Sequence, residues 1–184
     1  MRIRSLPALV ALIALVAQVG APIAQAKRML ASAGDDVVMG TQGADTLHLM
    51  PGNDKGYGRG GRDIILGDED GRGGRDFISG GAGDDRLFGM AGRDTVDGDS
   101  GNDVIHGGDG VDVMNGGPGN DTLDDAARHH SSAGDAFHGG PGNDDIYSRD
   151  GKRDTVDCGP GNDIAKADHA DKVAGNCERV VKIG

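Results

Sequence analysis

The chain has 184 residues, a formal net charge of −11 and a composition far from that of an average globular domain. It contains 35 glycines, three phenylalanines, two tyrosines and no tryptophan, which excludes a thick core of interdigitating aromatic side chains. The excess of acidic residues also argues against nucleic acid as a partner, because phosphate binding needs Lys and Arg gathered on one face.

Residues 1–26 have the features of a secretory signal peptide. Arg2 and Arg4 give a basic start, residues 8–19 form an apolar run, and Ala24-Gln25-Ala26 is a small-x-small cleavage site. The apolar run is shorter than the roughly 20 residues needed to cross a bilayer, which favours a cleaved signal over a membrane anchor. We therefore expect a secreted protein whose mature chain begins at Lys27 and has no membrane span.

A nine-residue repeat fills most of the mature chain. Six rows follow one another without a gap over residues 71–124, and they read GRGGRDFIS, GGAGDDRLF, GMAGRDTVD, GDSGNDVIH, GGDGVDVMN and GGPGNDTLD. Eight more rows can be written at residues 31–39, 40–48, 49–57, 58–66, 130–138, 139–147, 149–157 and 158–166. The sixth position is Asp in every row, and the fourth is Gly in all rows except those with Ala133 and Lys152. The consensus is GGxGxDxUx, where U is an apolar residue.

Three interruptions separate rows: residues 67–70, residues 125–129 and Ser148. We expect the longer two to loop outward between rows, because a stack of turns cannot absorb extra residues. The first of them is interpreted as a solvated acidic loop, with an ion of its own as the alternative. In row 49–57 Gly56 occupies the eighth, apolar position, which predicts a local thinning of the core.

These rows resemble the hemolysin-type, or RTX (repeats-in-toxin), calcium-binding proteins. The resemblance implies an all-β fold, a right-handed parallel β-roll in which GGxGxD forms a turn and xUx a short strand. It covers residues 27–166 and leaves residues 167–184 as a small C-terminal cap with Val173, Val180, Val181 and Ile183 as its apolar contacts. The eighth-position side chains should point inward and form a narrow core: Ile65, Ile78, Leu87, Val96, Ile105, Met114, Leu123, Phe137, Ile146 and Val156.

The turns have the composition of calcium sites. All 30 acidic residues except Glu69 and Glu178 are Asp, whose short carboxylate suits a cation that is also held by backbone carbonyls. Two rows make one level, so like-facing turns lie two rows apart, and Asp76 should share an ion with Asp94 and Asp85 with Asp103. Two files of several calcium ions would run along opposite edges. The ligands that the resemblance implies are Asp45, Asp63, Asp76, Asp85, Asp94, Asp103, Asp112, Asp121, Asp144 and Asp163, with the turn carbonyls of Gly83, Gly92, Gly101, Gly110 and Gly119.

Stacking the turns brings carboxylates of like charge together, so folding without cations should be unfavourable. With a thin core and 35 glycines to order, calcium binding and folding are expected to be one reaction. The predicted function is calcium binding by an exported protein that folds when calcium is bound.

Two cysteines, Cys158 and Cys177, lie in and beside the C-terminal segment. An even pair in an exported protein favours a disulfide, and a separation of 19 residues is close to one level of the roll. Two free thiols or a metal pair remain the alternatives.

Other functions find less support in the sequence. Gly98-Asp99-Ser100-Gly101 spells GDSG, the surroundings of a serine-protease nucleophile, but it stands in register with the repeat, and we predict no enzyme. His48, His106 and His138 occupy ninth positions far apart in the sequence, which disfavours zinc. The alternative that remains is an adhesive, surface or matrix protein that calcium stabilises and that binds an unknown glycan or protein partner.

Overall fold

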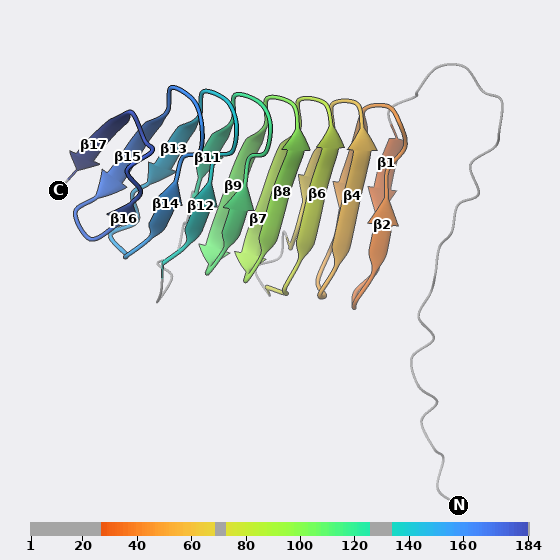
Figure 1. Cartoon of the computed structure of the whole chain (residues 1–184). Helices are drawn as coiled ribbons and strands as arrows, with labels where there is room; N and C mark the ends of the chain where they lie inside the picture. Colours follow the sequence, from red (N-terminus) through yellow and green to blue (C-terminus); the bar gives the residue numbers. More distant parts are fainter. Residues whose placement is uncertain (1–26, 69–72, 126–133, 184) are drawn as a thin grey trace, which may run out of the picture.

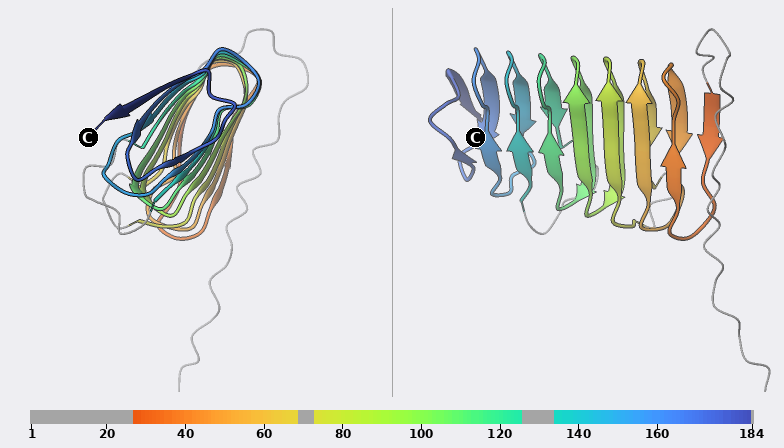
Figure 2. Two further views of the ribbon diagram at one scale, coloured as in Figure 1. Left: turned by 60° about the vertical axis from the view of Figure 1, so that its left-hand side comes forward. Right: turned by 45° about the vertical axis from the view of Figure 1, so that its right-hand side comes forward.

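The computed structural model describes residues 27–68, 73–125 and 134–183, and the chain winds there into a flattened coil with two parallel β-sheets as its walls (Figure 1). Seen obliquely along its length, the levels nearly superimpose as a narrow loop (Figure 2). This is the expected parallel β-roll. The predicted signal peptide lies outside the described residues.

Consecutive strands alternate between the two walls, so each strand pairs with the strand two places further along the chain. The nine-stranded sheet contains β1 (Lys27–Leu30), β3 (Asp45–His48), β5 (Ile64–Leu66), β7 (Arg86–Gly92), β9 (Val104–Gly110), β11 (Thr122–Asp124), β13 (Asp145–Ser148), β15 (Ile164–Asp168) and β17 (Arg179–Ile183). The eight-stranded sheet contains β2 (Val37–Met39), β4 (Lys55–Gly60), β6 (Phe77–Ala82), β8 (Thr95–Ser100), β10 (Val113–Asn115), β12 (Ala136–His138), β14 (Thr155–Asp157) and β16 (Lys172–Val173). No helix that could cross a bilayer occurs in the described part of the chain.

The register confirms that one level equals two rows. Thr95 lies opposite Val113 and Val104 lies opposite Thr122, an offset of 18 residues in each case. Side chains in a strand alternate between the two faces, so the eighth position points inward while the seventh and ninth point outward. The ten eighth-position residues expected in the core are all buried. Most strands therefore contribute one large side chain to the core, which is why the coil is thin.

Gly56 does not thin the core, contrary to expectation. Leu49, which replaces glycine at the first position of the same row, is fully buried. A Cβ on Gly56 would lie 3.0 Å from Leu49 Cδ2 and 3.2 Å from Ile65 Cγ2. The Leu49 side chain thus fills the space that the eighth position leaves open.

The two longer insertions lie inside turns and not between rows, which corrects the expected register. Gly67 has the surroundings of a first-position glycine, because a Cβ there would meet the Gly89 carbonyl and Asp76 Oδ2, so this row begins at Gly67 rather than Gly71. In the same way, the Asp125 carbonyl accepts the Gly108 N–H at 2.6 Å. The carbonyl of Gly139, which is the first residue of its row, accepts the Gly117 N–H in the same manner, so Asp125 takes the place of a first-position residue. Gly67 and Asp125 therefore each stand at the first position of a turn, while residues 69–72 and 126–133 lie outside the described residues.

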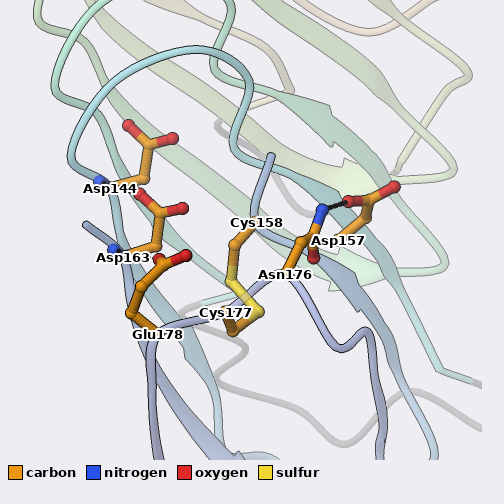
Figure 3. The surroundings of a disulfide bond; sticks show 7 residues. All are labelled: Asp144, Asp157, Cys158, Asp163, Asn176, Cys177 and Glu178. Carbon is orange, nitrogen blue, oxygen red and sulfur yellow. Dashed lines mark hydrogen bonds between the residues drawn. A yellow bond between two sulfur atoms is a disulfide. The ribbon is translucent and has the colours of Figure 1, made fainter. Parts of the chain in front are cut away.

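The chain after residue 166 continues the coil. Strands β16 and β17 add one parallel strand to each sheet, and Val173 packs against the core, while Val180 is exposed. The Cys158–Cys177 disulfide, with its Cα atoms 5.2 Å apart, joins this last level to the one before it (Figure 3). The predicted pairing is confirmed.

Glycine at the fourth position is required by the stacking of the turns. Gly101 has a φ of 141°, and a Cβ there would overlap the Gly83 carbonyl oxygen. Neither the backbone nor that oxygen can move without disturbing the level below.

We therefore expect Gly101→Ala to lower the stability of the calcium-loaded protein by about 2 kcal/mol or more, measured as the midpoint of chemical unfolding. Gly175→Ala is the matched control, because nothing lies within 4 Å of a Cβ at Gly175. Equal midpoints for the two variants would contradict the argument.

Removal of the disulfide should loosen the C-terminal end of the coil. For a loop of 19 residues, the free energy of unfolding should fall by about 3 kcal/mol, because the crosslink no longer restricts the unfolded chain. In a Cys158→Ala/Cys177→Ala variant in saturating calcium, backbone amides should exchange hydrogen faster than in the wild type in β15 and β17, and at the wild-type rate in β7 and β9. A uniform increase along the coil would argue against a local role.

Candidate metal centres

Two ladders of carboxylates run along opposite edges of the coil, as the repeat predicts. The backbone N–H of each sixth-position residue donates to a carboxylate oxygen of its counterpart on the next level, at 2.6–3.0 Å. The first ladder consists of Asp45, Asp63, Asp85, Asp103, Asp121, Asp144, Asp163 and Glu178. The second consists of Asp36, Asp54, Asp76, Asp94, Asp112, Asp135, Asp154 and Asp171.

The structure brings the ten predicted ligand carboxylates into these ladders, and all ten are buried. Their Oδ1 atoms accept the N–H bonds. In nine of them Oδ2 is buried and has no hydrogen-bond donor. The exception is Asp45, whose Oδ2 accepts from the Thr41 N–H at 2.6 Å and from the Thr41 hydroxyl at 2.8 Å. A buried carboxylate oxygen without a donor is costly unless a cation neutralises it.

Backbone carbonyls stand beside these oxygens, and they come from the first position of the row. A Cβ on Gly98 would lie 2.5 Å from Asp103 Oδ2 and 2.5 Å from the Gly116 carbonyl oxygen, and Gly80 and Gly116 have equivalent surroundings. The first-position glycine therefore leaves a small space into which a carboxylate and a carbonyl oxygen both project. Oxygen donors of these two kinds are the ligands that Ca²⁺ prefers.

The predicted carbonyl ligands belong to a different column. Gly83, Gly92, Gly101, Gly110 and Gly119 occupy the fourth position. The carbonyls of Gly83, Gly92, Gly101 and Gly119 lie against the fourth-position glycine of the next level, which is Gly101, Gly110, Gly119 and Gly142 respectively. Their role as ligands stays a prediction. The carbonyl ligands named from the sequence are all at the fourth position, although Gly also opens most rows.

Six ladder members were missing from the predicted ligands: Asp36, Asp54, Asp135, Asp154, Asp171 and Glu178. The first four stand at sixth positions, so counting the register consistently would have included them. Asp171 and Glu178 belong to the C-terminal segment, where the glycines that mark the row are lost. In Figure 3 Glu178 follows Asp144 and Asp163 in one column, and its Oε2 accepts the Asp163 N–H at 2.8 Å.

A third ladder, of side-chain amides, runs beside the first carboxylate ladder. Asn102, Asn120, Asn143 and Asn162 occupy the fifth position on successive levels, and each Oδ1 of the first three accepts the next residue's backbone N–H at 2.8–3.0 Å. Asp84 does the same for Asn102 at 3.0 Å. This ladder satisfies the outer N–H groups of the turns. Its signal in the sequence is the GND that recurs in these rows.

Burial raises the pKa of ladder carboxyls such as those of Asp94, Asp103 and Asp121 in the metal-free chain. Desolvation is the largest cause for each, followed by the accepted backbone N–H bond, which lowers the pKa, and by repulsion between neighbouring carboxylates, which raises it again. The pKa reaches about 8 for Asp94 and about 7 for Asp103 and Asp121. Without a cation, the coil therefore favours protonated carboxyls.

The residues considered for other chemistry are dispersed in this structure. His48, His106 and His138 lie on β3, β9 and β12, and the last of these strands belongs to the opposite sheet. His106 stacks on Phe88 with ring centroids 5.0 Å apart. Gly98 and Gly101 of the GDSG sequence occupy the first and fourth positions of a regular turn, and Asp99 accepts a bond from the Ser79 hydroxyl at 2.6 Å.

A parallel β-solenoid with aspartate ladders along its edges defines the class of calcium-binding repeat proteins. A family model of the RTX calcium-binding nonapeptide repeat matches four times, over residues 30–68, 70–105, 88–123 and 131–165. The chain belongs to this family. No curated protein matches it in a sequence comparison.

The raised pKa values predict how the metal-free protein responds to pH. The folded chain binds more protons than the unfolded chain between the ordinary Asp value of 3.8 and the raised values of about 6 to 8, so the free energy of unfolding falls as pH rises through that window. In chelator we expect the β-sheet circular dichroism signal to be strongest near pH 4 and to be lost towards pH 8. A signal that grows with pH would contradict this sign.

Proposed function

We propose that the protein is an exported calcium binder whose coil folds when calcium occupies both carboxylate ladders. The observation that carries the proposal is the row of buried Oδ2 atoms without donors, nine of them among the ten predicted ligands. Each level adds two such oxygens, and like charges about 4 Å apart repel by roughly 1–4 kcal/mol at dielectric constants between those of water and a protein surface. Cations bound between the levels would replace this repulsion by attraction between the ion and the carboxylates.

The residues present fit calcium. The ladder carboxylates would hold it, together with first-position carbonyls such as those of Gly98 and Gly116 and with the predicted fourth-position carbonyls. When bound, the ion supplies positive charge and crosslinks successive levels through oxygen ligands. Apolar burial adds little stability, because most strands bury a single large apolar side chain. Metal binding and folding are then coupled, as in small metal-dependent domains.

Export is part of the proposal. It is supported by the signal-like sequence of residues 1–26, by a disulfide, which forms in oxidising compartments, and by membership of the RTX family. Sites with millimolar to submillimolar affinity would stay empty in a calcium-poor cytoplasm and fill outside. The predicted domain boundaries at residues 26 and 166, the lack of a nucleic-acid partner and an unidentified extracellular partner remain part of the proposal. The adhesive alternative is not favoured, because the family match concerns calcium binding alone.

Titration with calcium tests the proposal. The mature chain at pH 7.5 should have little β-sheet signal in chelator and gain it cooperatively as calcium rises to millimolar concentrations, while magnesium at the same concentrations should have little effect. The same β-sheet signal in chelator and in calcium would overturn coupled folding, and the absence of bound calcium by calorimetry would overturn the proposal altogether.

The effect of the ladder charge can be tested with a substitution that removes the charge of one carboxylate and keeps its hydrogen bond to the backbone. Asp103→Asn retains an Oδ1 acceptor for the Asp85 N–H, which lies at 2.8 Å, but removes the negative charge. We expect the calcium midpoint of folding to rise at least about threefold, while the metal-free chain becomes no less structured because repulsion decreases. Asp157→Asn is the control, since Asp157 is exposed and outside both ladders. Equal midpoints for the two variants would contradict the role of the ladder charge.

A further inference from the structure

Three carboxylates gather where the second ladder departs most from the repeat. An oxygen of each of Asp125, Asp150 and Asp154 lies within 4.8 Å of the others. Asp154 is the sixth-position residue of its row, whereas the other two come from positions that the repeat does not make acidic. Strands β12 and β13 separate Asp125 from Asp150 and Asp154 in the sequence, and the winding of the coil brings the three residues together.

Two successive turns of the second ladder depart from the repeat here. Asp125 takes the first position of the turn before Asp135, where regular rows have glycine, and Lys152 takes the fourth position of the next turn, before Asp154. Asp150 is two residues before Lys152, and its Oδ1 accepts the Lys152 N–H at 2.7 Å, which holds the carboxylate in the turn. Each of these turns thus lacks a consensus glycine, and together they gain two carboxylates outside the consensus.

Two of these carboxylates, Asp150 and Asp154, each have a buried oxygen without a hydrogen-bond donor, which independently indicates that a cation binds there. Asp154 is fully buried, its Oδ1 accepts the Asp135 N–H at 2.7 Å, and its Oδ2 has no donor. Asp150 Oδ2 is likewise buried and without a donor. Among the described residues, no basic side chain forms an ion pair with Asp150 or Asp154. Within the described part of the chain, their charge is therefore uncompensated.

We propose that Asp125, Asp150 and Asp154 form a divalent-cation site at the irregular part of the second ladder, distinct in its ligands from the regular turns because it is built from side chains where the repeat would use turn carbonyls. The three oxygens lie within 4.8 Å of one another, close enough for one cation to contact all of them, and carboxylate oxygens are ligands that Ca²⁺ prefers. With three carboxylates for one ion, the site should fill at lower calcium than the regular turns, because affinity rises with ligand charge. This inference rests on the proposed function only in requiring a folded coil.

Native mass spectrometry of the mature chain at graded calcium concentrations would count the ions. Asp125→Asn/Asp150→Asn should bind one ion fewer than the wild type, and the missing ion should be the first to bind. Asp157→Asn, which alters an exposed carboxylate, should keep the wild-type number. An unchanged count and order of filling in the double variant would overturn the site.

Two further measurements separate the site from a structural role and from failure of the proposed function. In chelator, Asp150→Asn should be no less structured than the wild type, whereas a merely structural carboxylate would destabilise the chain when lost. Crystals of the wild type soaked in Tb³⁺ should show an anomalous peak among the three carboxylates, and no peak there would overturn the proposal without any variant. A wild type that binds no calcium would refute both proposals, while one that binds calcium only at regular turns would refute this one alone.

Discussion

The structure depends on how buried carboxylates are neutralised. Each level of the coil places one acidic side chain on each edge, uses one of its oxygens to accept a backbone N–H from the level before, and in most cases leaves the other oxygen without a donor. The accepted bond fixes the spacing of the carboxylates, and that spacing makes them repel one another. The geometry that stacks the turns is therefore also the geometry that requires cations.

The core cannot compensate for this repulsion. Its eighth-position side chains form a single row between the sheets, so the apolar area buried for each residue is small, and glycines add to the entropy that folding must overcome. Stacking is further constrained by the fourth-position column, where the carbonyl of one level occupies the place of a Cβ on the next. The repeat thus specifies an accurate scaffold that has little stability of its own.

Most of the architecture could be predicted from the sequence, because a nine-residue period fixes which side chains face inward, which turn lies above which, and how far apart paired residues stand. What could not be predicted arises where the period breaks. Two insertions lie inside turns because Gly67 and Asp125 continue the stacking contacts of the first position, and letter matching alone places the new rows at Gly71 and His130. Leu49 fills the space at Gly56 through a contact between two positions that the repeat treats as independent. The ladders extend to Asp171 and Glu178 because a hydrogen bond needs only an acceptor there, not the glycines by which a row is recognised.

The ladders give the coil a chemical polarity. At its beginning Lys27 joins the first ladder through its backbone N–H alone, which any residue except proline could supply. At its end Asp171 and Glu178 must present a side-chain acceptor, and the Asp171 N–H turns back to the Asp168 carbonyl at 3.3 Å, which closes the second ladder. Joining new modules to this scaffold is consequently asymmetric: a segment placed before it is almost unrestricted at the junction, whereas one placed after it must carry an acidic or amide side chain at each edge.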